Sequence, residues 1–475
     1  MKSFGNIAKD GQVRAVASGA LTDGSSVIIN SDGTVSVVAI GAVSASTSGT
    51  KFDDADGTMG LSYDSANGKV VIAYKDQGDS NKGKAVVATV SGTSISFGTP
   101  AVFNTGSTGA CKIAYDANAQ KHVIIYNDVG NSNYGTAVVA TVSGTSISFG
   151  SETVFESASS GEFAIAYNST AQKVVLFYRV SSQTNDGTLR VGTVSGTSIS
   201  FGTVNRFENG CENQSIAYDS SNDKMVLAYR DGGNSDKGVV RVGTVSGTTI
   251  SVGSEVEYES GDSLRNQIVY DETSGKIVIA YAEETNSNHG TAIAGTVSGT
   301  SVTFGSKVVF NAEETSYLGI TYDASAGKPI IAFRDGNTTT TSAVPVELDG
   351  TTVSFGTTTT IDTSGERYRQ QIVYDATSES NVIIYEGTNE GFASVYKAAS
   401  TNLTSENFIG FSDGAYADTQ SAAINTTNTI DRNQSGLTAG QTYFVQGDGT
   451  LGLTADDPSV TAGTAISATE LIVKG

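Results

Sequence analysis

A short motif that recurs with a nearly constant period constrains this chain more than any other feature. Each copy has an apolar residue, a small or β-branched residue, Tyr and then Asp (Asn in one copy), followed by a turn and an apolar run. Ile113–Asp116 followed by Lys121–Tyr126 is the clearest copy. A period near fifty residues indicates a repeat architecture. The Tyr recurs in steps of 51 or 52 residues, at Tyr63, Tyr115, Tyr167, Tyr218, Tyr270, Tyr322 and Tyr374.

A second motif lies between successive copies of the first. It reads Val-Ser-Gly-Thr-Ser and ends in Phe-Gly, as in Val90–Gly98 and Val142–Gly150. Its Ser-Gly pair is typical of a two-residue hairpin turn, because Gly tolerates positive φ. Each repeat therefore predicts four strands: A ending at the Tyr, an apolar B, and a C–D hairpin. Strand B is apolar on both faces, and radial stacking of sheets buries both.

These repeats predict an all-β fold, a seven-bladed β-propeller of four-stranded blades over residues 25–400. The last repeat lacks a D strand, and Ser31–Val38 copies that strand near the N-terminus. We therefore expect this N-terminal strand to complete the seventh blade and close the ring, which removes exposed sheet edges. Residues 1–24 are interpreted as an N-terminal arm, and residues 401–475, which break the repeat, as a small C-terminal β module.

Composition excludes several classes of function. The formal net charge is -21, and Lys and Arg form no runs, so we expect no nucleic-acid partner. No stretch approaches the roughly 20 apolar residues of a membrane span, and the first residues lack the apolar core of a signal peptide. One whole repeat separates Cys111 from Cys211, which predicts two free thiols.

The loops between strands B and C carry a weak acidic signature with two interpretations. Carboxylate and amide oxygens at this density can hold calcium. Asx turns that cap a hairpin explain the same residues, and the spacing is not that of a standard calcium loop. Apart from calcium, no cofactor is expected. The residues are Asp76, Asp79, Asn81, Asp128, Asn131, Asn133, Asp231, Asn234 and Asp236.

The loops between strands D and A differ most among the repeats, and in a propeller they share one face with the B–C loops. Variable loops on a rigid ring indicate a binding surface, although drift in exposed loops gives the same pattern. Two Arg side chains around a Tyr can bracket a sugar or a peptide carboxylate. The Arg residues that follow strand B have two interpretations: contact with anionic sugars through bidentate hydrogen bonds, or ordinary pairing with nearby acids, which is favoured. They are Arg179, Arg230 and Arg334. The candidate ligand-binding residues are Arg265, Tyr317, Arg367, Tyr368 and Arg369.

Catalytic motifs have little support. His122 and His289 are the two histidines, and they fall in non-adjacent repeats without metal-ligand spacing or a nucleophile motif. We therefore expect no enzymatic activity, with a propeller glycan hydrolase as an alternative.

The C-terminal stretches Asn407–Ile424 and Ser435–Gly475 resemble a terminal module that recurs in virion structural and tail-fibre-like proteins of marine bacteriophages, cyanophages among them. Ala17–Val38 looks like a segment of the same proteins, and the repeat is similar to their propeller repeats. The resemblance carries no catalytic residues. It implies a virion surface protein, made in the host cytoplasm, that acts as a tail fibre or adhesion protein and recognises a host-surface glycan or protein.

A passive head or tail decoration protein is the alternative within the same resemblance. We expect the C-terminal module to mediate assembly with other copies of this chain or with other virion proteins, because small β modules leave edges that can pair.

Overall fold

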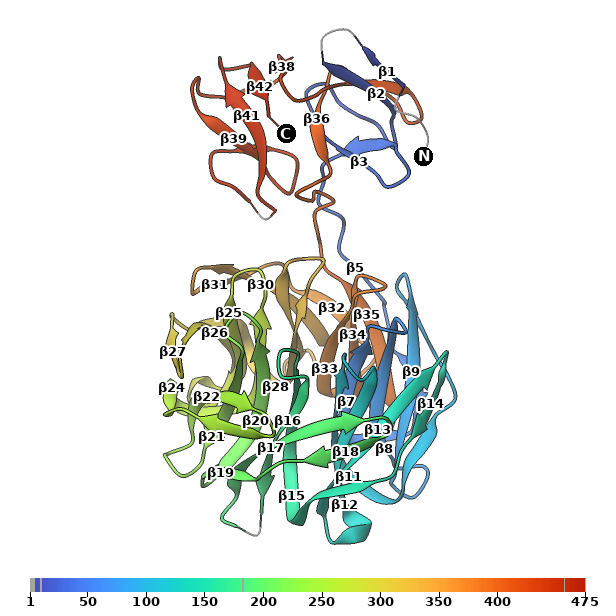
Figure 1. Ribbon diagram of the computed structural model, residues 1–475, viewed down its shortest axis with the longest axis vertical. Coiled ribbons are helices and arrows are strands. Elements are labelled where there is room, and N and C mark those ends of the chain that lie inside the picture. Colours follow the sequence, from blue (N-terminus) through green and yellow to red (C-terminus); the bar gives the residue numbers. More distant parts are fainter. Residues whose placement is uncertain (1–4, 9–10, 182, 457, 475) are drawn as a thin grey trace. The chain divides into compact units, whose positions relative to one another are not determined.

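The computed structural model describes residues 5–8, 11–181, 183–456 and 458–474. Within these ranges the regular structure is β-strand apart from two single-turn 3-10 helices, Val129–Asn131 and Glu284–Asn286. No helix in the described part of the chain is long and apolar enough to cross a membrane. The chain divides into two compact units, Ser44–Ala398 and a second unit made of Met1–Val43 with Ala399–Gly475 (Figure 1).

The first unit, Ser44–Ala398, is the predicted β-propeller, and its described residues form seven blades. The A strands are β7 (Ala55–Asp64), β11 (Ala101–Asp116), β15 (Thr153–Asn168), β20 (Cys211–Asp219), β24 (Val256–Asp271), β28 (Val308–Asp323) and β33 (Tyr368–Asp375). The B strands are β8 (Lys69–Asp76), β12 (Lys121–Asp128), β16 (Lys173–Val180), β21 (Lys224–Asp231), β25 (Lys276–Glu283), β29 (Lys328–Asp335) and β34 (Ser380–Glu386). Neighbouring A strands contact one another around the ring, β33 with β7 included, so strand A is innermost.

The C–D hairpins form the outer part of each blade, as the second motif predicts. The C strands are β9 (Lys82–Ser91), β13 (Tyr134–Ser143), β17 (Asp186–Ser195), β22 (Lys237–Ser246), β26 (His289–Ser298), β30 (Thr341–Asp349) and β35 (Gly391–Lys397). The D strands are β10 (Ser94–Phe97), β14 (Ser146–Phe149), β18 (Ser198–Phe201), β23 (Thr249–Val252), β27 (Ser301–Phe304) and β31 (Thr352–Phe355). Two short strands, β19 (Asn205–Glu208) and β32 (Thr359–Asp362), pair with β17 and β30.

The long A strands connect one blade to the next. The start of β11 pairs with β9 of the first blade, and its end pairs with β12 of the second. The strand therefore begins at the outer edge of one sheet and ends as the inner strand of its neighbour, and β15, β24 and β28 do the same.

The Tyr–Asp motif joins the blades. The Tyr270 hydroxyl donates to Ser221 Oγ in the preceding A–B turn at 2.6 Å. The Tyr63 hydroxyl lies 2.8 Å from Thr377 Oγ1 of the last blade, which closes the circle of contacts. The Asp caps its own turn: Asp64 Oδ1 accepts the amides of Ala66 and Asn67, each at 3.0 Å. The repeat is therefore visible in sequence because each blade needs the same link to its neighbour.

An N-terminal segment closes the last blade, as expected, but Ser31–Val38 is the wrong segment. The closing strands are β5 (Ser44–Ala45) and β6 (Thr50–Asp53), which pair with β35. β4 (Val35–Val37) instead pairs with the adjacent β3 (Ser26–Ile29) in the second unit. The Asp-Gly pair that resembles a C–D turn makes a local hairpin there, and a nearby partner strand costs less chain entropy than a distant one.

The second unit corrects the predicted domain boundaries. Residues 1–24 are not a separate arm, because β2 (Gln12–Val16) pairs with β37 (Ser421–Asn425) and Leu21 is buried. Residues 1–4 and 9–10 of that arm lie outside the described residues. The propeller occupies 44–398 rather than 25–400, and the module predicted at 401–475 is completed by the first 43 residues.

Two sheets build this second unit. The larger has the order β1-β2-β37-β36-β3-β4, and the smaller β38-β42-β41-β39-β40. Phe411 and Val445 belong to a buried cluster shared by both sheets. The other strands of this unit are β1 (Gly5–Ala8), β36 (Phe408–Ser412), β38 (Ile430–Asp431), β39 (Thr442–Val445), β40 (Leu451–Gly452), β41 (Val460–Ala465) and β42 (Leu471–Val473).

Cys111 and Cys211 are both buried thiols outside a disulfide, as the sequence predicts. Burial raises the pKa of the Cys111 thiol to about 12, so the folded protein keeps it protonated and unreactive at neutral pH.

Candidate functional site

A bulge interrupts each A strand a few residues before the motif Tyr. The register of the A–B pairing shifts there in all seven described pairs. A β-bulge bends its strand and re-aims a side chain. In four blades the residue five places before the Tyr has a left-handed φ, at Glu162 (48°), Asn213 (51°), Arg265 (61°) and Arg369 (57°).

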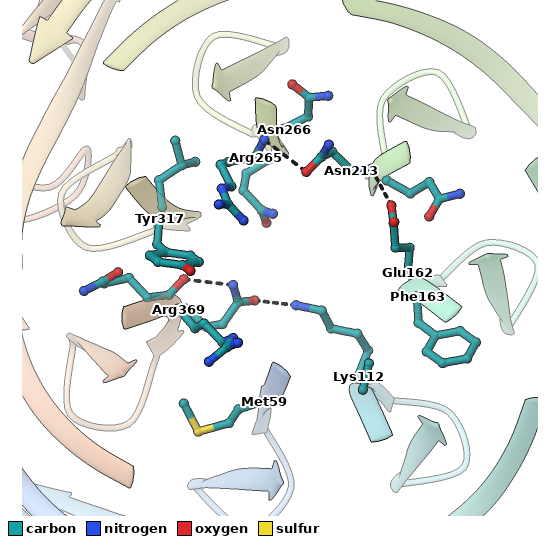
Figure 2. Close-up of a pocket in the computed structure, with 15 residues that line it drawn as sticks. Met59, Lys112, Glu162, Phe163, Asn213, Arg265, Asn266, Tyr317 and Arg369 are labelled. Atoms are coloured by element: carbon teal, nitrogen blue, oxygen red, sulfur yellow. Dashed lines mark hydrogen bonds between the residues drawn. The ribbon is translucent and has the colours of Figure 1, made fainter. Parts of the chain in front are cut away.

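These bulges direct side chains into one cavity at the centre of the ring, which we call the central cavity. Its volume is about 320 Å³, and every A strand contributes to its lining. Figure 2 shows Arg265, Tyr317 and Arg369 on one side of this space and Lys112 and Glu162 on the other. The bulges therefore place chemically different side chains at equivalent backbone positions around the cavity.

Polar contacts connect neighbouring blades around the central cavity. The backbone N–H of Asn213 donates to the Glu162 carboxylate at 2.7 Å, and the backbone N–H of Arg265 donates to Asn213 Oδ1 at 3.3 Å (Figure 2). Lys112 Nζ donates to Gln371 Oε1 at 2.7 Å. Burial lowers the pKa of Lys112 to about 8. These contacts fix the lining in place before any ligand arrives.

Three of the predicted ligand-binding residues meet at this cavity: Arg265, Tyr317 and Arg369. The Arg265 guanidinium lies 4.4 Å from the centroid of the Tyr317 ring, a cation–π contact. Arg369 forms an ion pair with Glu386. Tyr368 is one residue further out and lines an adjacent cavity, where its ring meets Tyr317 edge to face at 6.0 Å.

Arg367, the remaining predicted ligand-binding residue, is not available to a ligand. Its Nε donates to the buried Asp362 at 3.0 Å, and its guanidinium lies 4.4 Å from the centroid of Phe392. The residue is 9% exposed. A buried carboxylate needs a counter-ion, and Arg367 serves Asp362 in that role. The predicted bracket of two cations around Tyr368 is therefore wrong.

Sequence reasoning missed much of the central cavity because it looked for charged residues in variable loops. Met59, Lys112, Glu162 and Asn213 lie inside β-strands, where side chains are normally assigned to packing. Their common signal is a place three to five residues before the motif Tyr, and comparing the repeats across that short window would have found them.

The acidic B–C loops are Asx turns and ion pairs rather than a calcium site. Asp231 Oδ1 accepts the Gly233 amide at 2.9 Å, and Asp76 Oδ1 accepts the Asp79 amide at 3.1 Å. The backbone has left-handed φ values at Asn81, Asn133 and Asp236, and Asn and Asp tolerate this conformation, which explains their presence in the turns.

Three of the five carboxylates in these loops, those of Asp76, Asp79 and Asp236, have cationic partners. Lys84 pairs with Asp76 and, at 3.1 Å, with Asp79. Arg230 pairs with Asp236 at 3.0 Å. In the described ranges no group of three or more His, Cys, Asp or Glu side chains is arranged to hold a metal ion. The hydrogen bonds and ion pairs therefore favour the Asx-turn interpretation over calcium for these loops, whose residues are Asp76, Asp79, Asn81, Asp128, Asn131, Asn133, Asp231, Asn234 and Asp236.

His122 lies away from the central cavity, between two blades. It is fully buried, with Ser62 Oγ 2.8 Å from Nδ1 and Asp64 Oδ2 3.4 Å from Nε2. Burial is the larger influence on His122 and lowers its pKa, so the ring is neutral and joins two blades. This Ser, His and Asp set is part of the core.

The fold and the central cavity define a β-propeller with a polar, aromatic-edged opening at its axis. BP39L lectin from Burkholderia pseudomallei has a similar fold, with a TM-score of 0.54 and 10% identity over 74% of this chain and 99% of that chain. A protein from Lactobacillus plantarum covers 74% of this chain and 97% of its own at 12% identity, with a TM-score of 0.48. No protein-family model and no curated protein matches the sequence.

Proposed function

We propose that this chain is a phage virion surface protein, a tail fibre or receptor-binding protein, that recognises a host-surface glycan or protein through the central-cavity face of its propeller. One observation carries the proposal. Equivalent bulge positions on a repeated scaffold hold chemically different side chains: Ala110, Glu162, Asn213, Arg265, Tyr317 and Arg369. Packing alone would favour the same residue in every blade, whereas recognition of an asymmetric ligand requires different ones.

Two further points support this function. The protein BP39L is named as a lectin, so a fold of this kind is compatible with sugar binding, although fold alone does not determine function. Buried thiols outside a disulfide suit assembly in a reducing host cytoplasm before display on the virion.

The test is attachment of the fluorescently labelled full chain to a panel of marine bacteria that includes cyanobacteria. We expect attachment to a subset of strains and a loss of about tenfold when Arg265, Tyr317 and Arg369 are all replaced by Ala, because charge-assisted hydrogen bonds and an aromatic contact are lost. The matched control replaces Lys121 and Lys224 with Ala at the A–B turns, at the other end of the A strands.

The same assay separates the alternatives. A passive decoration protein attaches to no strain. A glycan hydrolase releases reducing sugar from cell-wall or capsule preparations, which we do not expect. Loss of attachment in the A–B turn variant alone would show that the opposite face binds.

A further inference from the structure

The residue that follows the strand-B aromatic is charged in most blades, and its partners differ in one of them. Lys75 pairs with Asp56 at 2.7 Å, and Arg179 pairs with Glu162 at 2.8 Å. Arg230 pairs with Glu212 at 2.6 Å. The pairing expected for these Arg residues is thus confirmed for Arg179 and Arg230. Arg334, at the same position in the sixth blade, forms no ion pair with any described residue.

Arg230 has three carboxylate partners, Glu212, Asp236 at 3.0 Å and Asp262 at 2.6 Å, and a substitution between repeats removes the first of them from the sixth blade. Glu212 lies six residues before Tyr218, and the equivalent position before Tyr322 is Ser316. Arg334 Nη1 donates to Ser316 Oγ at 3.0 Å, in the place where Arg230 meets a carboxylate. The sixth blade therefore keeps the cation of the repeat and lacks one of the anions that surround it in the fourth blade.

The Arg334 guanidinium is buried and has few hydrogen-bond partners. The residue is 9% exposed, and its Nε has no hydrogen-bond partner among the described residues. Glu314 accepts a hydrogen bond from Ser316 and Glu366 accepts one from the Tyr368 hydroxyl, and neither carboxylate forms an ion pair with Arg334. A buried cation without an anion is unfavourable. The arrangement is stabilised when an anion enters from outside.

An open space reaches Arg334, which we call the side cavity. It is about 280 Å³, and Arg265, Tyr317, Arg334 and Tyr368 all line it. Arg334 lies 5.2 Å from the Tyr368 ring centroid, so the two Tyr rings are each faced by an Arg. Arg265 also lacks an ion pair in the described part of the chain. Asn288 contributes a buried Oδ1 without a partner.

We propose that the side cavity binds the carboxylate of an acidic saccharide, with Arg334 as the main anchor and Arg265 as the second cation. This inference rests on the proposed function and names its ligand class. Guanidinium groups bind carboxylates in a planar, bidentate way. The Tyr rings offer apolar faces and hydroxyls to a sugar ring, and the volume is at the small end of ligand sites, about 300 Å³. A single hexuronate residue suits this combination.

The experiment titrates the full chain with sodium glucuronate and follows binding by saturation-transfer NMR. Methyl glucoside is the neutral match, and sodium phosphate tests for charge alone. We expect glucuronate to bind at least about tenfold more tightly than either, because the carboxylate supplies charged hydrogen bonds and the ring supplies the aromatic contact. Equal binding of phosphate, equal binding of the glucoside, or no binding of glucuronate overturns the proposal.

Ser316→Glu is the sharpest variant because it restores the carboxylate that the fourth blade has. We expect it to raise the melting temperature of the ligand-free protein and to weaken glucuronate binding by about tenfold or more, since Arg334 then has an internal partner. Arg334→Gln should weaken binding equally and keeps the test valid if the first variant folds poorly. Arg230→Gln, at the equivalent position of the fourth blade, should leave glucuronate binding unchanged.

Attachment to cells distinguishes this inference from the proposed function. If the wild-type chain attaches to host cells but glucuronate does not bind, the ligand class is wrong and the function stands. If glucuronate binds and Ser316→Glu abolishes that binding while no strain is recognised, the site is real and the proposed function is wrong.

Discussion

The two units of this molecule differ in how far apart along the chain their paired strands lie. In the propeller, apart from the closing pairs of β5 and β6 with β35, each strand pairs with a strand close to it along the chain, so the order of blades follows the order of repeats. In the second unit the strand order is β1-β2-β37-β36-β3-β4, which interleaves segments about 400 residues apart, as in the pairing of Gln12 with Asn425. Most strand pairs in the ring are local and recur in every blade, whereas the sheets of the second unit form only when the two ends of the chain meet.

The largest expected effect is on folding, when each unit or part of it is expressed as a separate fragment. Residues 44–398 alone should fold and melt cooperatively, because every blade is complete within them. Residues 401–475 alone should remain unfolded, because β36 and β37 lose the partners β2 and β3 and expose apolar surface. Circular dichroism of both fragments tests this.

A third fragment is the control for that comparison. It joins residues 1–43 to residues 399–475 through a Gly-Ser linker and should recover a folded β-sheet signal. A folded 401–475 fragment would show that the N-terminal strands are dispensable.

The same contrast explains what could be predicted from sequence. The period located every A strand, because the motif Tyr makes the same kind of hydrogen bond to a neighbouring blade in most repeats. These bonds are made by Tyr63, Tyr167, Tyr218, Tyr270 and Tyr322. Nothing repeats in the second unit, and the alternation in Gln12–Val16 predicts a strand without naming its partner. The segment Ser31–Val38 was misassigned for that reason: its turn chemistry fits any hairpin, and only the tertiary partner decides which.

The site was predictable to a smaller degree. Arg265, Tyr317 and Arg369 fall in the central cavity, but the bulge that aims them arises from a shift in pairing that period-two reasoning does not anticipate. Arg367 and Arg369 look equivalent in sequence, two residues apart, yet one supports Asp362 in the core and the other lines the cavity.

Removing the closing strand should have the next largest effect. A chain of residues 54–398 lacks β5 and β6, so β35 becomes an exposed edge and the buried Phe52 no longer packs against Tyr74 at 5.2 Å. We expect a loss of about 5 kcal/mol in the free energy of unfolding relative to residues 44–398, together with self-association. Urea unfolding and light scattering measure both. Equal stability of the two fragments would mean that ring closure contributes little.

Two substitutions, Arg367→Ala and Arg432→Ala, compare the contribution of one ion pair in each unit to the free energy of unfolding. In the propeller Arg367→Ala leaves the fully buried Asp362 without its cation, and we expect a cost of about 3 kcal/mol. In the second unit Arg432 is 66% exposed and pairs with Glu470 at 3.3 Å, so Arg432→Ala should cost less than about 1 kcal/mol. Urea denaturation of the full chain gives both values if the units unfold separately. Similar costs would show that Arg367 is not a core residue in solution.

The smallest expected effect concerns one contact between blades and its dependence on pH. Burial lowers the pKa of His122, and the nearby Lys121 acts in the same direction. The folded state therefore favours the neutral ring, whose Nε2–H donates to Asp64 while Nδ1 accepts from Ser62. Because the folded pKa is below the unfolded value, stability is complete above about pH 6.5 and is lost as the pH falls toward the folded pKa. We expect urea unfolding to show a loss of about 1 kcal/mol between pH 7 and pH 5.5.

The chain supplies its own control for this histidine. Asn381 occupies the same position in the last blade, and its Nδ2 donates to Asp323 at 2.6 Å without a titrating ring. His122→Asn should therefore keep the bond to Asp64 and remove the loss of stability between pH 7 and pH 5.5. His289→Asn should leave that loss unchanged, because His289 starts β26 and is only half-buried. Hydrogen bonds from His122 and Asn67 outweigh burial and hold the pKa of Asp64 below its usual range, so this carboxylate titrates outside the same window. If the pH dependence survives in His122→Asn, another group is responsible, and the link between the first two blades does not depend on a neutral imidazole.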